Sequence, residues 1–211
     1  MPPSRRLIAV STILFAALIQ SVSVGQTKQE EPRKVVTDPE EYQVYNTVLN
    51  TTYYGKDQGR FVISLETSSS RKSAFIGIRT GITFSGAKRP DVESETSANF
   101  DAQNRDTFEL ANRFSLKIPY SLVNFEELKS IFPLEEGKTL DMECWNRFYK
   151  KYPKSHGIIG FSRVGFNSKK TQALVYAANQ SNFVGGSGRF FVLSKQTGHW
   201  EVQEEVVVWL S

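Results

Sequence analysis

The C-terminal third of the chain alternates apolar and polar residues, which is the period of a β-strand. Four such segments follow one another, joined by short polar links: 158–166, 171–178, 188–194 and 199–210. Links of this kind are typical of hairpins, so the pattern predicts a four-stranded antiparallel meander. In the last segment Trp200, Val202, Val206 and Val208 share a face opposite Glu201, Gln203 and Glu205. We therefore expect helices on one face of the sheet and a partly wet opposite face.

A helical period begins at Asp38, well before these strands. Asp38 is a good helix cap, Pro39 suits the first helical position, and Glu41 follows the cap at the spacing of a capping box. Apolar side chains then recur on one helical face until Gly55 ends the helix. Residues 61–67 (FVISLET) are rich in strand-forming residues and predict the first strand.

A second helix is predicted after Asn124, which has Glu127 three residues later and is followed by Pro133 as a stop. Between the first strand and this helix the pattern is hard to interpret. Residues 91–110 show only a weak helical period, and the segment 68–90 holds either a short strand pair around Gly77 and Gly81 or a structured loop.

The last predicted helix spans about 141–152. Its aromatic residues Trp145, Phe148 and Tyr152 recur at helical spacing, so we expect them in the core and not on a ligand-stacking surface. Helices therefore precede the sheet. This order predicts an α+β fold, with N-terminal helices packed on a C-terminal four-stranded antiparallel meander.

The first 25 residues have the features of an export signal. Two arginines precede an apolar run at 7–19, and Ser23 and Gly25 are the small residues of a cut before Gln26. The sequence thus predicts three parts: a signal peptide at 1–25, a linker at 26–37 and a single α+β domain at 38–211. The alternative is a membrane tether, with residues 7–24 uncleaved.

Charge and cysteine content exclude a nucleic-acid interface and an internal disulfide. The chain holds 26 Lys and Arg against 22 Asp and Glu. Removal of Arg5 and Arg6 with the signal leaves 24 against 22, a net charge of +2. The basic residues are scattered among acids and do not gather on one aromatic-lined face, as a nucleic-acid-binding protein requires. Cys144 is the single cysteine and has no partner within the chain.

The stretch GGSG (185–188) contains three glycines, Gly185, Gly186 and Gly188, that suggest a phosphate-binding loop. Such a loop lies between a strand and the N-terminus of a helix. Here the following residues, RFFVLS, predict a strand. We therefore interpret the glycines as a turn between two strands, where they permit positive φ angles.

No catalytic constellation is evident in the sequence. His156 lies near Ser162 and one helix after Cys144, but no third group is placed to orient the imidazole. His199 opens a strand, and neither histidine belongs to a zinc-ligand pair. The sequence predicts no metal and no cofactor. A hydrolase that uses His156 with Ser162, or an unidentified carboxylate pair, remains the enzymatic alternative.

Three segments of the C-terminal half form an ordered pattern: WNRFYKKYPKSHGIIGFSRVGFN, QALVYAANQ and GSGRFFVLSKQTGHWEVQEEVVVW. This pattern resembles an uncharacterised family of exported bacterial proteins over residues 114–211. The resemblance implies a shared fold and no particular activity. Family members tend to carry two cysteines where this chain has Ser181 and Gly185, so the resemblance implies a looser loop here, held by glycine turns alone.

The resemblance also marks Ser162, Arg163 and Asn167. An arginine within a strand, next to Gly165, is the best single candidate for a polar site. The interpretation we favour for it is an ion pair with a glutamate on a neighbouring strand.

Taken together, these patterns predict an exported, non-enzymatic binding or interaction domain. Its partner is expected to be a protein or a small-molecule ligand. The candidate binding residues are Ser162, Arg163, Asn167, Gly185, Gly186 and Gly188.

Overall fold

The computed structural model describes residues 34–70, 87–133, 142–182 and 184–211, which all lie in one unit of the chain, Pro32–Ser211. The predicted signal peptide or tether, most of the predicted linker, and the strand pair or loop predicted around Gly77 and Gly81 lie outside the described residues. Val35–Val36, at the end of that linker, form strand β1, which pairs in parallel with β3 (Glu109–Leu110).

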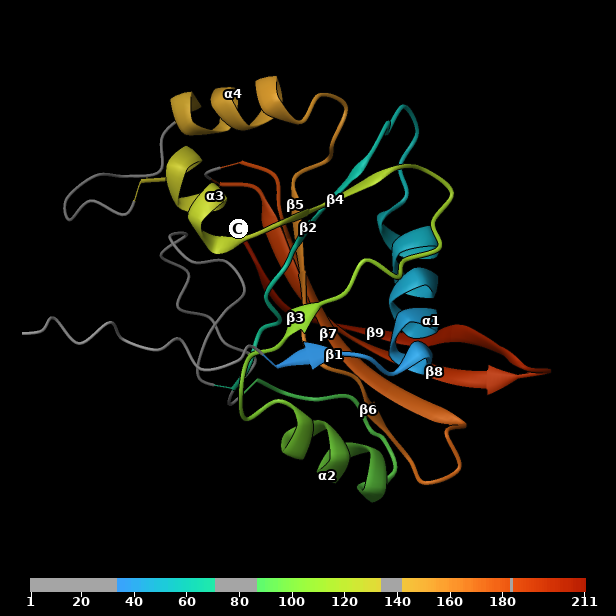
Figure 1. Ribbon diagram of the computed structural model, residues 1–211. Helices are drawn as coiled ribbons and strands as arrows, with labels where there is room; N and C mark the ends of the chain where they lie inside the picture. The colour runs from blue at the N-terminus through green and yellow to red at the C-terminus, as the bar shows by residue number, and fades with distance from the viewer. Residues whose placement is uncertain (1–33, 71–86, 134–141, 183) are drawn as a thin grey trace, which may run out of the picture. The chain divides into compact units, whose positions relative to one another are not determined.

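A mixed seven-stranded sheet forms the centre of the structure (Figure 1), in the order β4-β2-β5-β7-β8-β9 with β6 beside β7. The strands are β2 (Phe61–Ser64), β4 (Tyr120–Val123), β5 (Ile158–Phe161), β6 (Gly165–Phe166), β7 (Gln172–Gln180), β8 (Gly186–Gln196) and β9 (His199–Leu210). The α+β class is confirmed, and so is a strand at the start of FVISLET. The four-stranded antiparallel meander is wrong as a description of the sheet. Strands β5, β7, β8 and β9 do pair antiparallel, but β2 and β4 extend the sheet in parallel beyond β5.

The predicted strand 158–166 is divided in two. Arg163 and Val164 leave the ladder between β5 and β6, whereas the Ser162 N–H still donates to the Tyr176 carbonyl of β7. Two of the polar candidates, Ser162 and Arg163, lie at this interruption.

The three predicted helices form where expected: α1 (Pro39–Val48), α3 (Phe125–Ile131) and α4 (Met142–Lys151). The side chains of Asp38 and Asn124 cap the first two by accepting backbone N–H groups. A π-helical turn, η1 (Leu49–Tyr53), follows α1. A further helix, α2 (Ser94–Gln103), lies within the weakly periodic stretch 91–110.

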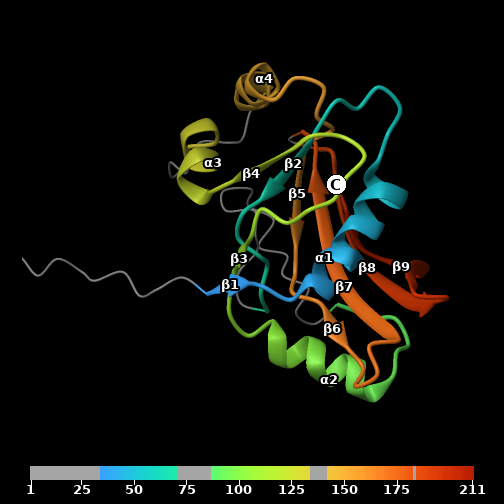
Figure 2. The ribbon, with the colours of Figure 1, turned by 45° about the vertical axis from the view of Figure 1, so that its right-hand side comes forward.

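Both faces of the central strands are buried, whereas the polar positions of β9 are exposed, so the expected partly wet face is found only at that edge of the sheet. Helix α1 packs on one face, where alternate strand residues such as Ile63, Phe161 and Phe191 form a core (Figure 2). Helices α3 and α4, together with Phe100 of α2, cover the other face. The predicted core residues Trp145, Phe148 and Tyr152 are buried there.

Strand β9 turns its two ends to opposite faces because its pairing with β8 shifts register between Val192 and Leu193, where Gln203 is an extra residue of β9. Trp200 and Val202 contact the α1 core, whereas Val206 and Val208 contact the other. The prediction that these four residues share a face is therefore wrong. A bulge adds one residue and so exchanges inward and outward positions, which an alternating pattern does not reveal.

The turn between β8 and β9 permits a direct test of backbone strain. Thr197 and Gly198 both have positive φ, at 49° and 87°, the geometry of a type I′ hairpin in which asparagine precedes glycine. Thr197→Asn is expected to raise the free energy of unfolding by about 1 kcal/mol, because a β-branched residue is disfavoured there. Urea denaturation measures the gain. Thr197→Ala also removes the β-branch but lacks the amide with which asparagine bonds locally in this conformation, so we expect a smaller gain from alanine, and an equal gain would contradict a contribution of the amide.

Candidate functional site

Arg163 and Glu41 form a buried ion pair that joins helix α1 to the connection between β5 and β6. Arg163 Nε lies 3.1 and 2.9 Å from the two Glu41 carboxylate oxygens, and Nη2 lies 2.5 Å from Oε1. The side chains are only 11% and 3% exposed. The Arg163 guanidinium also stacks on Phe108, 4.3 Å from the ring centroid. The predicted ion pair is thus confirmed, but its glutamate is on a helix and not on a neighbouring strand.

The Val164 N–H donates to the Glu41 carboxylate at 3.1 Å. The Tyr45 hydroxyl shares its proton between this carboxylate, at 3.1 Å, and the Ser162 carbonyl, at 3.0 Å. Burial and the nearby Glu41 charge raise the pKa of Tyr45 well above its usual value, so this phenol stays protonated and donates. Burial alone would lower the pKa of Arg163, but its hydrogen bond with Glu41 and the Glu41 charge raise it, so the guanidinium stays charged. Glu41 is therefore a buried anchor and not part of a capping box, because the Asp38 cap accepts from Glu40.

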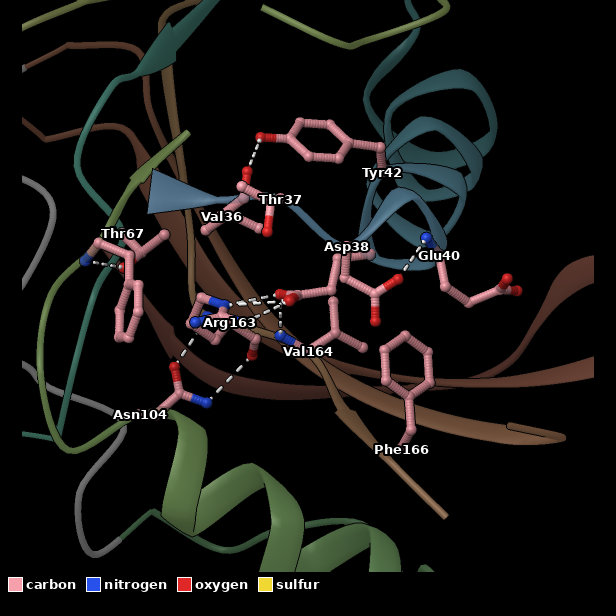
Figure 3. A network of polar contacts seen from close by, with 12 residues as sticks. Val36, Thr37, Asp38, Glu40, Tyr42, Thr67, Asn104, Arg163, Val164 and Phe166 are labelled. Atoms are coloured by element: carbon pink, nitrogen blue, oxygen red, sulfur yellow. Dashed lines mark hydrogen bonds and ion pairs between the residues drawn. The ribbon is translucent and has the colours of Figure 1, made fainter. Parts of the chain in front are cut away.

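The side chains of Asn104 and Ser162 also bind the backbone at Arg163. Asn104 accepts the Arg163 N–H at 2.8 Å and donates to the Arg163 carbonyl at 3.0 Å (Figure 3). The Ser162 hydroxyl accepts the Tyr176 N–H and donates to the Arg163 carbonyl, both at 2.9 Å. The connection thus keeps its backbone hydrogen bonds, with side chains as partners.

Side chains of helix α2 likewise accept backbone N–H groups of β6 and of the turn that follows it. Asn99 accepts the Phe166 N–H at 2.9 Å, and Glu95 accepts the Ser168 N–H at 3.0 Å. Gly165 permits this contact, because a Cβ atom there would lie 2.5 Å from the backbone nitrogen of Phe100. The outer edge of β6 is therefore occupied by side chains of α2.

Asn167 shapes the turn after β6. Its amide donates to Glu93 and Thr171, and its carbonyl oxygen accepts the N–H groups of Thr171 and Gln172. Ser162 and Arg163 thus lie before β6 and Asn167 lies after it, each with its own set of partners. The structure uses all three to hold the chain in place.

The glycines of GGSG lie at the other end of β7, about 26 Å from Asn167 at 3.3 Å per residue. The stretch does border a turn, because Ser181–Gly185 joins β7 to β8, but Gly186 and Gly188 belong to β8. The described glycines with positive φ are Gly157 and Gly198, so the conformational role assigned to this stretch is wrong. At Gly188 the reason is space, because a Cβ atom would lie 2.1 Å from Trp209 Nε1.

Hydrogen bonds hold the β7–β8 loop in addition to its glycines, contrary to the expectation drawn from the missing cysteines. The Ser181 N–H and hydroxyl both donate to the Gly185 carbonyl. Gln180 donates to the Asn182 carbonyl, and the Tyr149 hydroxyl donates to the Ser181 carbonyl at 2.6 Å.

The residues considered for catalysis are not assembled. His156 and Ser162 lie at opposite ends of β5, which places their α-carbons about 10 Å or more apart. Both hydrogen bonds of the Ser162 hydroxyl go to the backbone. Cys144 is buried against Arg147. Among the described residues, no group of three or more His, Cys, Asp or Glu side chains is placed to hold a metal ion.

A groove of about 600 Å³ lies beside this scaffold. It is bounded by Asp38 before α1, by α2, and by the turn after β6. Its lining residues are mostly polar: Asp38, Glu95, Ala98, Asn99, Gln103, Phe166, Asn167, Ser168 and Lys170. Of the predicted binding residues, only Asn167 lines it. We define these nine residues as the α2 groove, and it is the candidate site of this chain.

Lys170 and Asp38 form an ion pair across the α2 groove, with Nζ 2.7 Å from Oδ2. The Lys170 Nζ also lies 5.3 Å from the centroid of the Phe166 ring. The backbone of Lys170 has a positive φ of 50°. Hydrogen bonds from Ser168 lower the pKa of Glu95, so this exposed carboxylate is ionised near neutral pH. The α2 groove can accept and donate hydrogen bonds, and its lining has neither a histidine nor a cysteine.

The ion pair predicts how Asp38 contributes to stability. Burial alone would raise the pKa of Asp38, but hydrogen bonds from Lys170 and the Glu40 N–H lower it below 3.8. A lowered pKa stabilises the folded state above pH 3.8, and this contribution is lost as the pH falls through the folded-state value. Asp38→Asn keeps the cap, and both side chains are partly exposed, so we expect a loss below about 1 kcal/mol at pH 7.

Urea denaturation of the wild type and of Asp38→Asn, at pH 7 and at a pH well below 3.8, measures this contribution to the free energy of unfolding. The exposed Asp91→Asn is the control. The difference is expected to vanish well below pH 3.8. A difference that persists in acid would contradict an electrostatic origin.

The sequence analysis missed most of the α2 groove and the anchor Glu41. Glu95, Asn99 and Gln103 recur every four residues, a spacing that places them on one side of α2, but the apolar period there is weak. The acidic residues near the start of α1 were explained as helix caps.

Comparisons with known protein families, with characterised proteins and with solved structures find no significant match to this chain. The family resemblance of the C-terminal half therefore stays a prediction. Within the ranges that the structure describes, no helix has the length and apolar character of a membrane span.

Proposed function

We propose that this chain is an exported, non-enzymatic binding domain that takes a polar ligand in the α2 groove. The observation that supports the proposal is a groove that is lined mostly by polar residues and built on a fixed scaffold. Asn99 and Glu95 are held by backbone N–H groups, and the turn that carries Lys170 is held by Asn167. Side chains fixed in this way lose little freedom when a ligand binds.

A ligand screen with a blocking variant tests the proposal. A ligand at about a hundred times its dissociation constant adds about 2.7 kcal/mol to the free energy of unfolding, which raises the melting temperature by several degrees. Ala98 is exposed and lines the groove, so Ala98→Trp is expected to fill it and abolish the shift. Ala102 is exposed on the same helix outside the groove, so Ala102→Trp is the matched control.

Sugars, peptides, nucleotides, anions and metal ions form the screen. A ligand that shifts the wild type and Ala102→Trp, but not Ala98→Trp, supports the proposal. A flat screen, or a shift that Ala98→Trp leaves intact, contradicts it.

Export is supported by the charge and apolar pattern of residues 1–25. The N-terminal sequence of the protein from its native host tests this part. A start at Gln26 is expected, and an intact N-terminus would favour the membrane tether.

A further inference from the structure

The ligand class follows from the hydrogen-bonding groups that the α2 groove leaves free. Asn167 uses its side chain within the turn, and the Asp38 carboxylate accepts from Glu40 and Lys170. The Gln103 amide makes no hydrogen bond among the described residues, and the Asn99 NH₂ group is likewise unused. Glu95 is exposed and keeps lone pairs that can accept.

These free groups form a line along one helix. Glu95, Asn99 and Gln103 are four residues apart, so successive side chains are about 6 Å apart along the axis and the line is about 12 Å long. The line offers donors and acceptors to the same ligand, since an amide has both and a carboxylate only accepts. A ligand whose groups each donate and accept matches this line best.

Charge and ring contacts exclude two other ligand classes. Lys170, the cation among the described lining residues, is already paired with Asp38, so an anion finds no free cation in the groove. The Phe166 ring is covered by Lys170 and contacts Trp200, with ring centroids 5.6 Å apart. An aromatic ligand therefore finds no open ring on which to stack.

An extended peptide is also disfavoured. Such a ligand commonly adds as a strand to a free sheet edge. At this groove the edge is β6, and its Phe166 N–H is already bound by Asn99, as is the Ser168 N–H beyond it by Glu95.

We propose that the α2 groove binds a short neutral oligosaccharide, whose hydroxyl groups donate to Glu95 and exchange hydrogen bonds with the amides of Asn99 and Gln103. This inference rests on the proposed function and names its ligand class. Binding is expected to be weak, because the groove is open and its polar groups exchange one hydrogen-bonded partner, water, for another.

Calorimetric titration of the purified full chain tests the inference. The probes are neutral cello-, malto-, xylo- and chito-oligosaccharides, with inorganic phosphate, a sulfated oligosaccharide and an unstructured peptide as other classes. Gln103→Ala removes a free amide that no described residue uses, so it is expected to weaken binding of a neutral oligosaccharide about 3- to 10-fold without unfolding the protein. Gln203→Ala, on an exposed position of β9, is the matched control and should leave the affinity unchanged.

Each outcome is decisive. Binding of a neutral oligosaccharide that Gln103→Ala weakens and Gln203→Ala does not supports the inference. An anion or a peptide that binds in this Gln103-dependent way overturns the inference and leaves the proposed binding function intact. An oligosaccharide whose affinity is unchanged by Gln103→Ala overturns the inference as well. If no probe binds here or in the broader screen, the inference and the proposed function fail together.

Discussion

Glu41→Gln is expected to lower the free energy of unfolding by about 3 kcal/mol, because it leaves the Arg163 guanidinium buried without a counter-charge. The glutamine keeps the shape of the side chain, so the loss reports the charge and not a cavity. Four donor groups meet this carboxylate: Nε and Nη2 of Arg163, the Val164 N–H and the Tyr45 hydroxyl. The change therefore weakens the attachment of α1 to the β5–β6 connection at several points.

Urea denaturation at pH 7 measures this loss, and Glu143→Gln supplies the control. Glu143 and Arg147 form an ion pair on α4 whose side chains are 77% and 45% exposed. The same substitution there should cost less than about 0.5 kcal/mol, since water screens an exposed pair. Similar losses at both positions would show that burial does not make the Arg163–Glu41 pair special.

Gly165→Ala is the second large effect, with an expected loss of about 3 kcal/mol. The new Cβ atom would lie 2.5 Å from the nitrogen and Cβ of Phe100 and 2.6 Å from its Cα. Two of these are helix backbone atoms, so α2 has to move away from β6 to make room, and overpacking of this kind costs 1–3 kcal/mol or more. The movement would also stretch the hydrogen bond between Asn99 and the Phe166 N–H.

The comparison variant is Gly185→Ala, in which the new atom meets only the amide end of the Asn182 side chain. A side-chain end can rotate, so we expect a clearly smaller loss there. Thermal and urea denaturation of both variants tests the idea. If alanine is tolerated equally well at both positions, the close approach of α2 to Gly165 does not explain the glycine.

Local patterns predicted the elements whose determinants are local. Asp38 and Asn124 cap α1 and α3 with their own side chains, and the aromatic spacing of α4 places Trp145 and Phe148 in the core. The strand at FVISLET was likewise evident from its strand-forming residues.

The elements that escaped prediction depend on distant partners. Strand β2 pairs in parallel with β4 and β5, and no turn residue signals a parallel neighbour. Helix α2 has little apolar periodicity, because it is held by polar bonds from Asn99 and Glu95 to the backbone of a later segment.

The candidate site shows the same division. Arg163 was recognisable as an unusual residue, and an ion pair was the right interpretation. Its partner Glu41 was not recognisable, because a glutamate three residues after a cap has an ordinary explanation in the helix itself. The two residues are 122 positions apart in sequence, and only the packing of α1 on the sheet brings the carboxylate to its arginine.

The parallel pairing of β2 with β5 also sets the order in which this chain can fold. Ile63 is opposite Ile159, 96 positions later (159 minus 63), and β5 in turn needs β7 as its neighbour. The centre of the sheet therefore cannot close until the chain has been synthesised through β7, and contacts this distant in sequence make folding slow. A delay of this kind is compatible with the export that we propose, because a chain whose core has not yet formed can still be translocated.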